Sequence, residues 1–252
     1  MVKLIKIYKN FNIIKQHKRS IILIGNFDGL HLGHQKLFKL AKNFKTVGYD
    51  INSKRIDSLK KGIDFNNEFK KKEIKQINLT FSKKIEDIDR CNFYIICVPT
   101  PITFSKKPDL KYIKKTFDLL SKILKKNDII VLESTVYPGV TEMFINKLEK
   151  KTKLINNKDF STCYSPERIN PGDKERNLNN INKILAYEGK NKKVKLLLNK
   201  VYKEICKKLV FSKNIKEAET AKGIENIQRD LNIALFNEIL IICHKLKLNF
   251  NE

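Results

Sequence analysis

Short apolar runs alternate along this chain with longer stretches whose apolar residues recur at helical spacing. We expect strands near residues 20–24, 46–49, 78–81, 93–98, 128–132, 160–164 and 183–187. We expect helices near residues 35–42, 53–61, 110–125, 140–150 and 193–207. This alternation predicts βαβ units, and therefore an α/β fold with a mostly parallel sheet and flanking helices. Sheets of this kind bind ligands beyond the carboxyl ends of their strands.

The last segment has a different pattern. From residue 215 to about 246 the helical spacing is continuous, with no Pro and with Gly223 as its one Gly. A helix of about 30 residues is far longer than the average in globular proteins. Such a helix usually crosses between domains or packs against another subunit, so we expect a homodimer formed through it.

The charge balance is strongly basic, but its distribution is uninformative about partners. The 252 residues carry a formal net charge of +25, and only 6 of the 52 basic residues are Arg. Nucleic-acid readers usually depend on Arg for bidentate contacts. The Lys residues are scattered through every segment, which indicates A/T-rich codon usage rather than a nucleic-acid or membrane partner. Such a field still attracts anionic small substrates such as nucleotides.

Two absences in the sequence bear on the compartment. No run of about 18 apolar residues is present, and the N-terminus is too charged for a signal peptide. The cysteines show neither CxxC nor Cys/His ligand spacing, which argues against disulfides and against a metal site. They are five in number, Cys91, Cys97, Cys163, Cys206 and Cys243. We therefore expect a cytoplasmic protein.

A glycine- and histidine-containing loop follows the first strand, over residues 25–34. His31 and His34 could donate to phosphate oxygens, while Gly33 allows close backbone approach and the helix start favours anions. Two unrelated surface histidines are the alternative. Residues 8–42 resemble the start of bifunctional riboflavin kinase/FMN adenylyltransferases (FAD synthetases). That resemblance implies a nucleotidyltransferase site on ATP, with Asn26 and Asp28 beside the two histidines. The later motifs of that family do not follow.

Four further candidates lie at or beyond the ends of predicted strands. Asp50 can accept hydrogen bonds from the hydroxyls of an adenosine ribose, or it can be a loop or cap residue. Arg55 lies near Asp50 or is a solvated helix residue. Residues 98–100, Val-Pro-Thr, by themselves predict a rigid turn. Thr135 lies in residues 133–142, where helix N-capping is the alternative role.

Two later motifs are more specific. Residues 164–173 contain two Pro and a Gly that fix a loop bearing Glu167, Arg168 and Asp173. A surface loop with incidental charges is the alternative. Lys222 and Asn226 are four residues apart and share one helix face, which could also be an ordinary solvated face.

From about residue 43 to 252, these motifs in this order resemble the bacterial nucleotide-sugar dehydrogenases, near the UDP-N-acetylhexosamine 6-dehydrogenases. The resemblance implies a Rossmann-like domain, NAD as cofactor and a UDP-sugar as substrate, which is oxidised to its uronic acid. The resemblance implies that Thr135 holds the cofactor or a catalytic water, and that Glu167 contributes acid/base chemistry or orients a water. It implies that Lys222 stabilises the developing oxyanion, and that Asn226 binds the substrate or a water. The implied cofactor-binding residues are Gly25, Asp50, Arg55, Val98, Pro99, Thr100 and Thr135.

The sequence also departs from this family. The family's G-x-G-x-x-G element is replaced by residues 24–34, where Phe27 and Asp28 oppose close approach of a pyrophosphate. None of the five cysteines matches the family's nucleophile, and the UDP-binding domain is not recognised. We therefore expect a truncated chimera with little turnover. Its expected parts are residues 1–42, a strand–loop–helix element; 43–212, a Rossmann-like domain; and 213–252, the start of a helical dimerisation domain. A non-catalytic nucleotide-binding remnant is the other alternative.

Overall fold

The computed structural model describes residues 2–3, 20–25, 40–41, 43–63, 71–75, 78–167 and 182–250. Within them, nine strands form one sheet in the order β4-β3-β2-β5-β6-β7-β8-β9, with β1 paired to β2. The strands are β1 (Val2–Lys3), β2 (Ser20–Gly25), β3 (Lys45–Tyr49), β4 (Leu79–Ser82), β5 (Phe93–Cys97), β6 (Ile129–Leu132), β7 (Ser161–Tyr164), β8 (Asn182–Ala186) and β9 (Lys208–Ser212). The helices are α2 (Ser53–Lys61), α3 (Lys71–Ile74), α4 (Glu86–Asp89), α5 (Lys111–Leu120), α6 (Val140–Thr152), α7 (Lys192–Lys203) and α8 (Ile215–Lys245).

The sheet is parallel from β4 through β7. The chain runs outward from β2 to β3 and β4, then returns to place β5 on the other side of β2. The crevice between β2 and β5 is therefore the point at which the strand order reverses, where doubly wound sheets bind ligands. Two pairings depart from the parallel pattern: β8 is antiparallel to β7, and β1 is antiparallel to β2.

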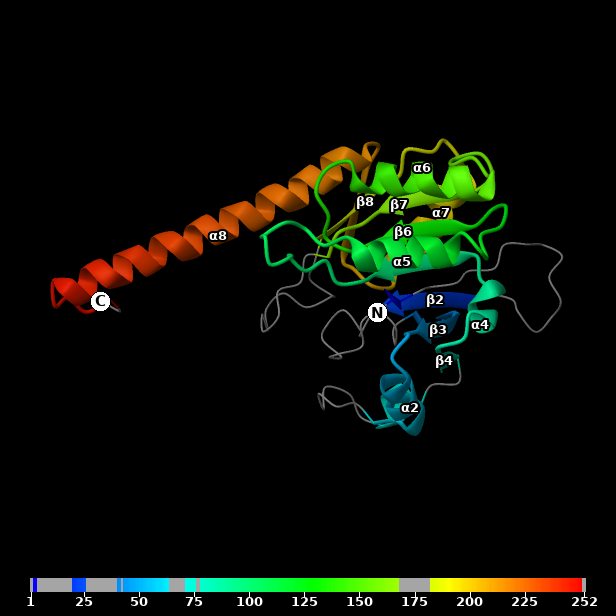
Figure 1. Cartoon of the computed structure of the whole chain (residues 1–252), viewed down its shortest axis with the longest axis horizontal. Coiled ribbons are helices and arrows are strands. Elements are labelled where there is room, and N and C mark those ends of the chain that lie inside the picture. The colour runs from blue at the N-terminus through cyan, green and yellow to red at the C-terminus, as the bar shows by residue number, and fades with distance from the viewer. Residues whose placement is uncertain are drawn as a thin grey trace.

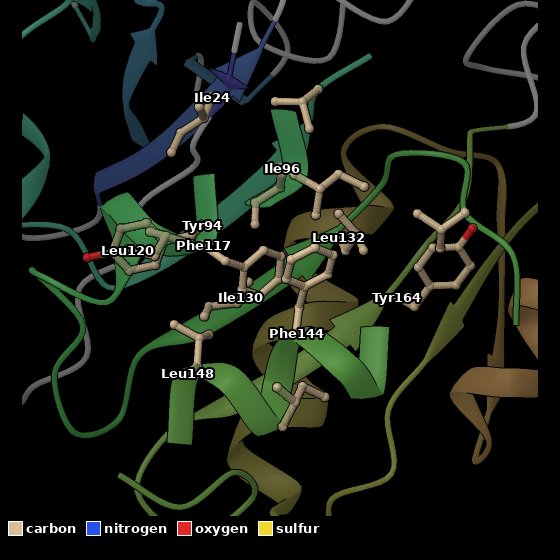
Figure 2. Close-up of a cluster of buried hydrophobic side chains, with 14 of the residues drawn as sticks. Ile24, Tyr94, Ile96, Phe117, Leu120, Ile130, Leu132, Phe144, Leu148 and Tyr164 are labelled. Carbon is tan, nitrogen blue, oxygen red and sulfur yellow. The ribbon is translucent and has the colours of Figure 1, made fainter. Parts of the chain in front are cut away.

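Helices cover both faces of the sheet (Figure 1). Buried residues of α5 and α6 pack on one face, and buried residues of α2 and α7 pack on the other. On the first face, the rings of Phe117 and Phe144 stack with centroids 4.9 Å apart. Figure 2 shows them in one cluster with Ile130 and Leu132 of β6. Burying side chains of this size stabilises the fold by about 1.5–3 kcal/mol each.

The hydrophobic pattern predicted most of these elements correctly. The helix at residues 53–61 and the long C-terminal helix are confirmed, and the seven predicted strands form within one or two residues of their expected ends. The helix expected over 110–125 ends at Leu120, because Lys122 and Ile123 bond carbonyls three residues back in a tight turn. The helix expected over 193–207 ends at Lys203, and β9 follows it unpredicted. Of the helix expected over 35–42, Leu40 and Ala41 are described and are helical.

Helix α8 spans 31 residues and begins at Asn214, whose side chain accepts a hydrogen bond from Glu217 N. Its buried residues, among them Ile215, Ala218 and Glu219, lie in the first turns. Beyond these turns the helix projects away from the sheet (Figure 1). Among the described residues, no helix combines the length and the apolar character that crossing a membrane requires.

Candidate functional site

The predicted site residues gather along one edge of the sheet. Gly25 ends β2, Asp50 follows β3, Val98 follows β5, and Glu167 comes shortly after β7. These strands are parallel, so their carboxyl ends lie at the same edge. Gly25 pairs with Cys97 at the place where the strand order reverses.

Asp50 is fully buried at the end of β3. Its Oδ1 accepts a hydrogen bond from Asn52 N at 2.7 Å, and the Asn52 side chain in turn caps α2 by accepting from Arg55 N. This linked turn fixes the carboxylate at the strand end, and a carboxylate can accept hydrogen bonds from hydroxyl groups. Arg55 is only 6% exposed, so the alternative of a solvated helix residue is wrong.

The loops after β5 and β6 are joined by two hydroxyl groups. Ser134 Oγ donates to the Val98 carbonyl at 2.7 Å, and Thr100 Oγ1 donates to the Thr135 carbonyl at 2.8 Å. Helix α6 is capped at Gly139, which has φ +92° and forms no side-chain cap bond. The helix N-cap role considered for Thr135 is therefore wrong. Thr135 instead lies half-buried in the loop between β6 and α6.

Glu167 is half-buried in the loop that leaves β7. Ser165, two residues earlier, is held by its N–H to the Leu132 carbonyl at 2.9 Å and by its Oγ to the Ile184 carbonyl at 2.8 Å. The start of this loop is therefore built into the sheet. Arg168 and Asp173 lie outside the described residues, as do Asn26, Asp28, His31, Gly33 and His34.

Helix α8 is fastened to the sheet edge by Glu219, which is fully buried. Its carboxylate accepts hydrogen bonds from Gly139 N at 2.6 Å, Thr141 N at 2.9 Å and Thr141 Oγ1 at 2.6 Å. A carboxylate at a helix N-terminus is stabilised by the helix dipole. The anchor also sets where the next turns of α8 lie relative to the loop that bears Thr135.

Lys222 and Asn226 follow Glu219 along α8. Lys222 is 7% exposed, and its Nζ lies 3.0 Å from Glu225 Oε2, so the alternative of a solvated face is wrong for this lysine. Asn226 is half-buried. The structure thus connects Lys222 to the Thr135 loop through Glu219, a residue to which the sequence analysis gave no role.

A buried charged cluster at the same edge was missed. Lys183 Nζ lies 3.2 Å from Glu133 Oε1, and Tyr202 donates its hydroxyl to the same oxygen at 2.7 Å. Burial and the adjacent Glu133 raise the pKa of Tyr202 well above its ordinary value. One signal could have found Lys183: it shares the inward-facing register of β8 with Leu185.

Two cysteines, Cys163 and Cys97, lie near this edge. Cys163 is fully buried in β7, and burial raises the pKa of its thiol well above the ordinary value, which disfavours the reactive thiolate. Cys97 is half-buried at the end of β5, with its Sγ 3.4 Å from Glu133 Oε2.

These features define a Rossmann-type dinucleotide-binding domain: a doubly wound parallel sheet with a fixed carboxylate after its second parallel strand and hydroxyl-bearing loops beyond the next strands. The residues present at this edge therefore fit NAD. The chain belongs to the UDP-glucose/GDP-mannose dehydrogenase family. The model of that family's NAD binding domain matches residues 28–206, and the model of its central domain matches residues 216–252.

Individual relatives agree with this family. The chain is 43% identical to the UDP-N-acetyl-D-glucosamine 6-dehydrogenase of Salmonella typhi, over 94% of this chain and 55% of the relative. It is 42% identical to the enzyme of the same name from Pseudomonas aeruginosa, over 92% and 54%. The solved UDP-D-ManNAc dehydrogenase of Pyrococcus horikoshii superposes with a TM-score of 0.79 at 30% identity, over 88% of this chain and 54% of that chain. The chain thus spans about half the length of these relatives.

The dehydrogenase similarity extends further toward the N-terminus than the motifs indicated. The family match begins at residue 28 rather than near 43. The Salmonella relative aligns over 94% of the chain, more than residues 43–252 could supply. These comparisons give no support to the FAD synthetase resemblance of residues 8–42. The domain boundaries near 42 and 212 stay predictions.

Proposed function

We propose that this chain contributes to the NAD-dependent oxidation of a UDP-N-acetylhexosamine to the corresponding uronic acid. The observation that carries the proposal is the buried Lys222, which Glu219 anchors beside the Thr135 loop at the ligand-binding edge of the sheet. The relatives named UDP-N-acetyl-D-glucosamine 6-dehydrogenase, 43% and 42% identical, support the substrate class.

The cofactor would lie across the edge at the strand-order reversal. Asp50 would accept hydrogen bonds from the adenosine ribose, and Arg55 follows it on α2. The backbone at Gly25 and at residues 98–100 would line the crevice, with Thr135 holding the cofactor or a catalytic water. NAD, when bound there, would accept a hydride from the carbon being oxidised.

The substrate side of the site would use three residues. The Lys222 ammonium would stabilise the oxyanion that develops as the alcohol loses its proton, and its burial strengthens that interaction because little water screens it. Glu167 would accept the proton or orient a water, since a carboxylate in a half-buried loop can exchange protons with solvent. Asn226, one turn beyond Lys222, would bind the sugar or a water.

Exchange of the Glu167 carboxylate for an amide tests the function. We expect Glu167→Gln to lower the rate of NADH formation by about a hundredfold or more, with UDP-N-acetylglucosamine or UDP-N-acetylmannosamine as substrate. The matched control is Glu238→Gln, an exposed position on α8, which should keep the wild-type rate. The proposal fails if the wild-type chain forms no NADH with either sugar, or if Glu167→Gln matches the control. A folded chain without NADH formation would favour the non-catalytic remnant.

We also propose a homodimer formed through α8, and a cytoplasmic location. The dimer is supported by the exposed apolar side chains that α8 presents beyond its anchored turns. The location is supported by the five cysteines, none of which forms a disulfide in the described structure, as is usual in a reducing compartment.

A further inference from the structure

Three side chains from distant parts of the chain form a buried polar cluster beneath the candidate site. Glu133 follows β6, Lys183 lies in β8 and Tyr202 lies in α7. The side chains of Glu133 and Lys183 are 0% and 4% exposed. The Lys183 ammonium also lies over the Tyr202 ring, 5.7 Å from its centroid. Outside this cluster the sheet faces are lined mainly by hydrophobic side chains.

Lys183 connects this cluster to the loop that carries Glu167. Its Nζ donates to the carbonyls of Ser165 and Pro166, at 3.2 Å each, and these two residues directly precede Glu167. The geometry follows from topology. Because β8 is antiparallel to β7, its first residues lie at the edge where β7 ends. The third partner of the ammonium is Glu133 Oε1, which is two residues from Thr135.

Stability alone does not explain such a pair. Desolvation of two buried charges offsets most of their attraction, and an apolar replacement of similar volume is often equally stable. An ammonium with three directed donors does, however, fix the position of three acceptors relative to one another. Here the acceptors belong to the two loops that bear Thr135 and Glu167.

We propose that the Glu133–Lys183 ion pair is a positioning device, which holds the Glu167 loop at a fixed separation from the Thr135 loop. Lys183 acts through the Ser165 and Pro166 carbonyls and is a positioning residue, not a catalytic one. The consequence for catalysis rests on the proposed function of Glu167, whereas the restraint on the loop does not.

The test compares Lys183→Met with Lys183→Arg in the full chain. The methionine variant keeps the volume but removes all three donors. We expect amide hydrogen exchange in the peptide covering residues 161–167 to become about tenfold faster or more. We expect kcat to fall by about ten- to a hundredfold with an unchanged KM for the UDP-sugar, since small misplacements of a reacting group cost rates of this size. The arginine variant, which keeps charge and donors, should recover most of both losses.

Two further variants keep the result interpretable. Lys151→Met removes an exposed lysine paired with Asp118 and should change neither measurement. The second is a triple variant that combines Glu133→Leu, Lys183→Met and Tyr202→Phe. It removes both charges of the ion pair together, so no charge is left buried without its partner, and it should fold even if Lys183→Met does not. It should still show fast loop exchange and low kcat.

The positioning proposal is overturned if loop exchange in Lys183→Met, or in the triple variant where Lys183→Met does not fold, equals that of wild type. It is also overturned if kcat stays at the wild-type level in an active enzyme. If the wild-type chain forms no NADH, the proposed function fails, and the exchange measurement alone decides whether Lys183 holds the loop.

Discussion

Asp50 combines complete burial with a position at the ligand-binding edge. The Asn52 amide and the capped start of α2 hold its carboxylate in place, so its position is fixed before any ligand binds. Such preorganisation spares the cost of ordering the group when the ligand binds.

We predict that Asp50→Asn raises the dissociation constant for NAD by about tenfold to a hundredfold. The amide keeps the shape but loses the charged acceptor, and a hydrogen bond to a charged group contributes about 1.5–3 kcal/mol. Isothermal titration calorimetry measures this effect. Asp57→Asn, which changes an exposed carboxylate on the nearby helix α2, should bind NAD as the wild type does. Equal affinities for the two variants would contradict the role of Asp50.

For single residues, the sequence was enough to identify candidates near the ends of predicted strands. It did not predict which buried polar side chains form hydrogen bonds with one another. Asp50 was found because it comes directly after a predicted strand, and Thr135 was found through the resemblance to the dehydrogenase family. Glu133 was not paired with Tyr202, nor Glu219 with Gly139, because each pair is separated by many residues and depends on the crossover connections. Hydrophobic periodicity carries no information about which distant elements meet at one edge.

Most helices and strands could be predicted from the sequence, because the apolar residues of each recur with one dominant period. The wrong predictions concerned the ends of helices. Apolar residues after Lys203, among them Ile205 and Cys206, continue the helical spacing of α7, although the helix has already ended. The chain there turns to place β9 beside β8, a tertiary pairing that local spacing does not encode. The antiparallel direction of β8 was missed for the same reason.

Helix α8 lacks a single apolar stripe in its outer half. Ile239, Leu240, Ile241 and Ile242 are consecutive and are 36–52% exposed. Successive helical residues point about 100° apart, so these four cover every side of the helix. A helix that is apolar all round is normally buried on all sides.

We predict that the double substitution Leu235→Glu and Ile242→Glu abolishes self-association. The wild-type chain should have twice its 29.5 kDa mass in multi-angle light scattering, whereas the variant should be monomeric, because a charge cannot be buried in the apolar interface at low cost. Asn232→Glu with Gln228→Glu adds the same charge at exposed polar positions of α8 and should remain dimeric. A monomeric wild-type chain over the measured concentrations would contradict the dimer.

For the whole molecule, buried tyrosines contribute to the response to alkaline pH, and Tyr94, Tyr164 and Tyr202 are among them. Burial is the largest cause that raises the pKa of Tyr94, Tyr164 and Tyr202 above the ordinary value. Below about pH 10 these groups are protonated in both the folded and the unfolded chain, and their stabilising effect is fully present. Above it the unfolded chain loses the protons and the folded chain does not, so the free energy of unfolding falls.

We predict that the unfolding free energy decreases between pH 10 and 11.5, by up to about 1.4 kcal/mol per pH unit for each tyrosine. Tyr202→Phe should make this decrease less steep, whatever its effect at pH 8. Tyr137→Phe removes an exposed hydroxyl and serves as the control, with a slope like that of wild type. Urea titrations at several pH values give the slopes. Identical slopes for the Tyr202 and Tyr137 variants would contradict the prediction.

Because Glu219 fixes α8 at one end only, a small rotation there moves the far end of the helix by a larger distance. The carboxylate fixes the first turns of the helix to the N-terminus of α6, and the rest of α8 projects beyond the sheet (Figure 1). At 1.5 Å per residue, the part from Glu219 to Lys245 is about 39 Å long, so a tilt of about 10° at the anchor displaces its far end by about 7 Å. A small shift of the loop between β6 and α6 is thereby amplified along the helix. Whatever packs around the outer half of α8 is mechanically connected to the edge of the sheet where the nucleotide would bind.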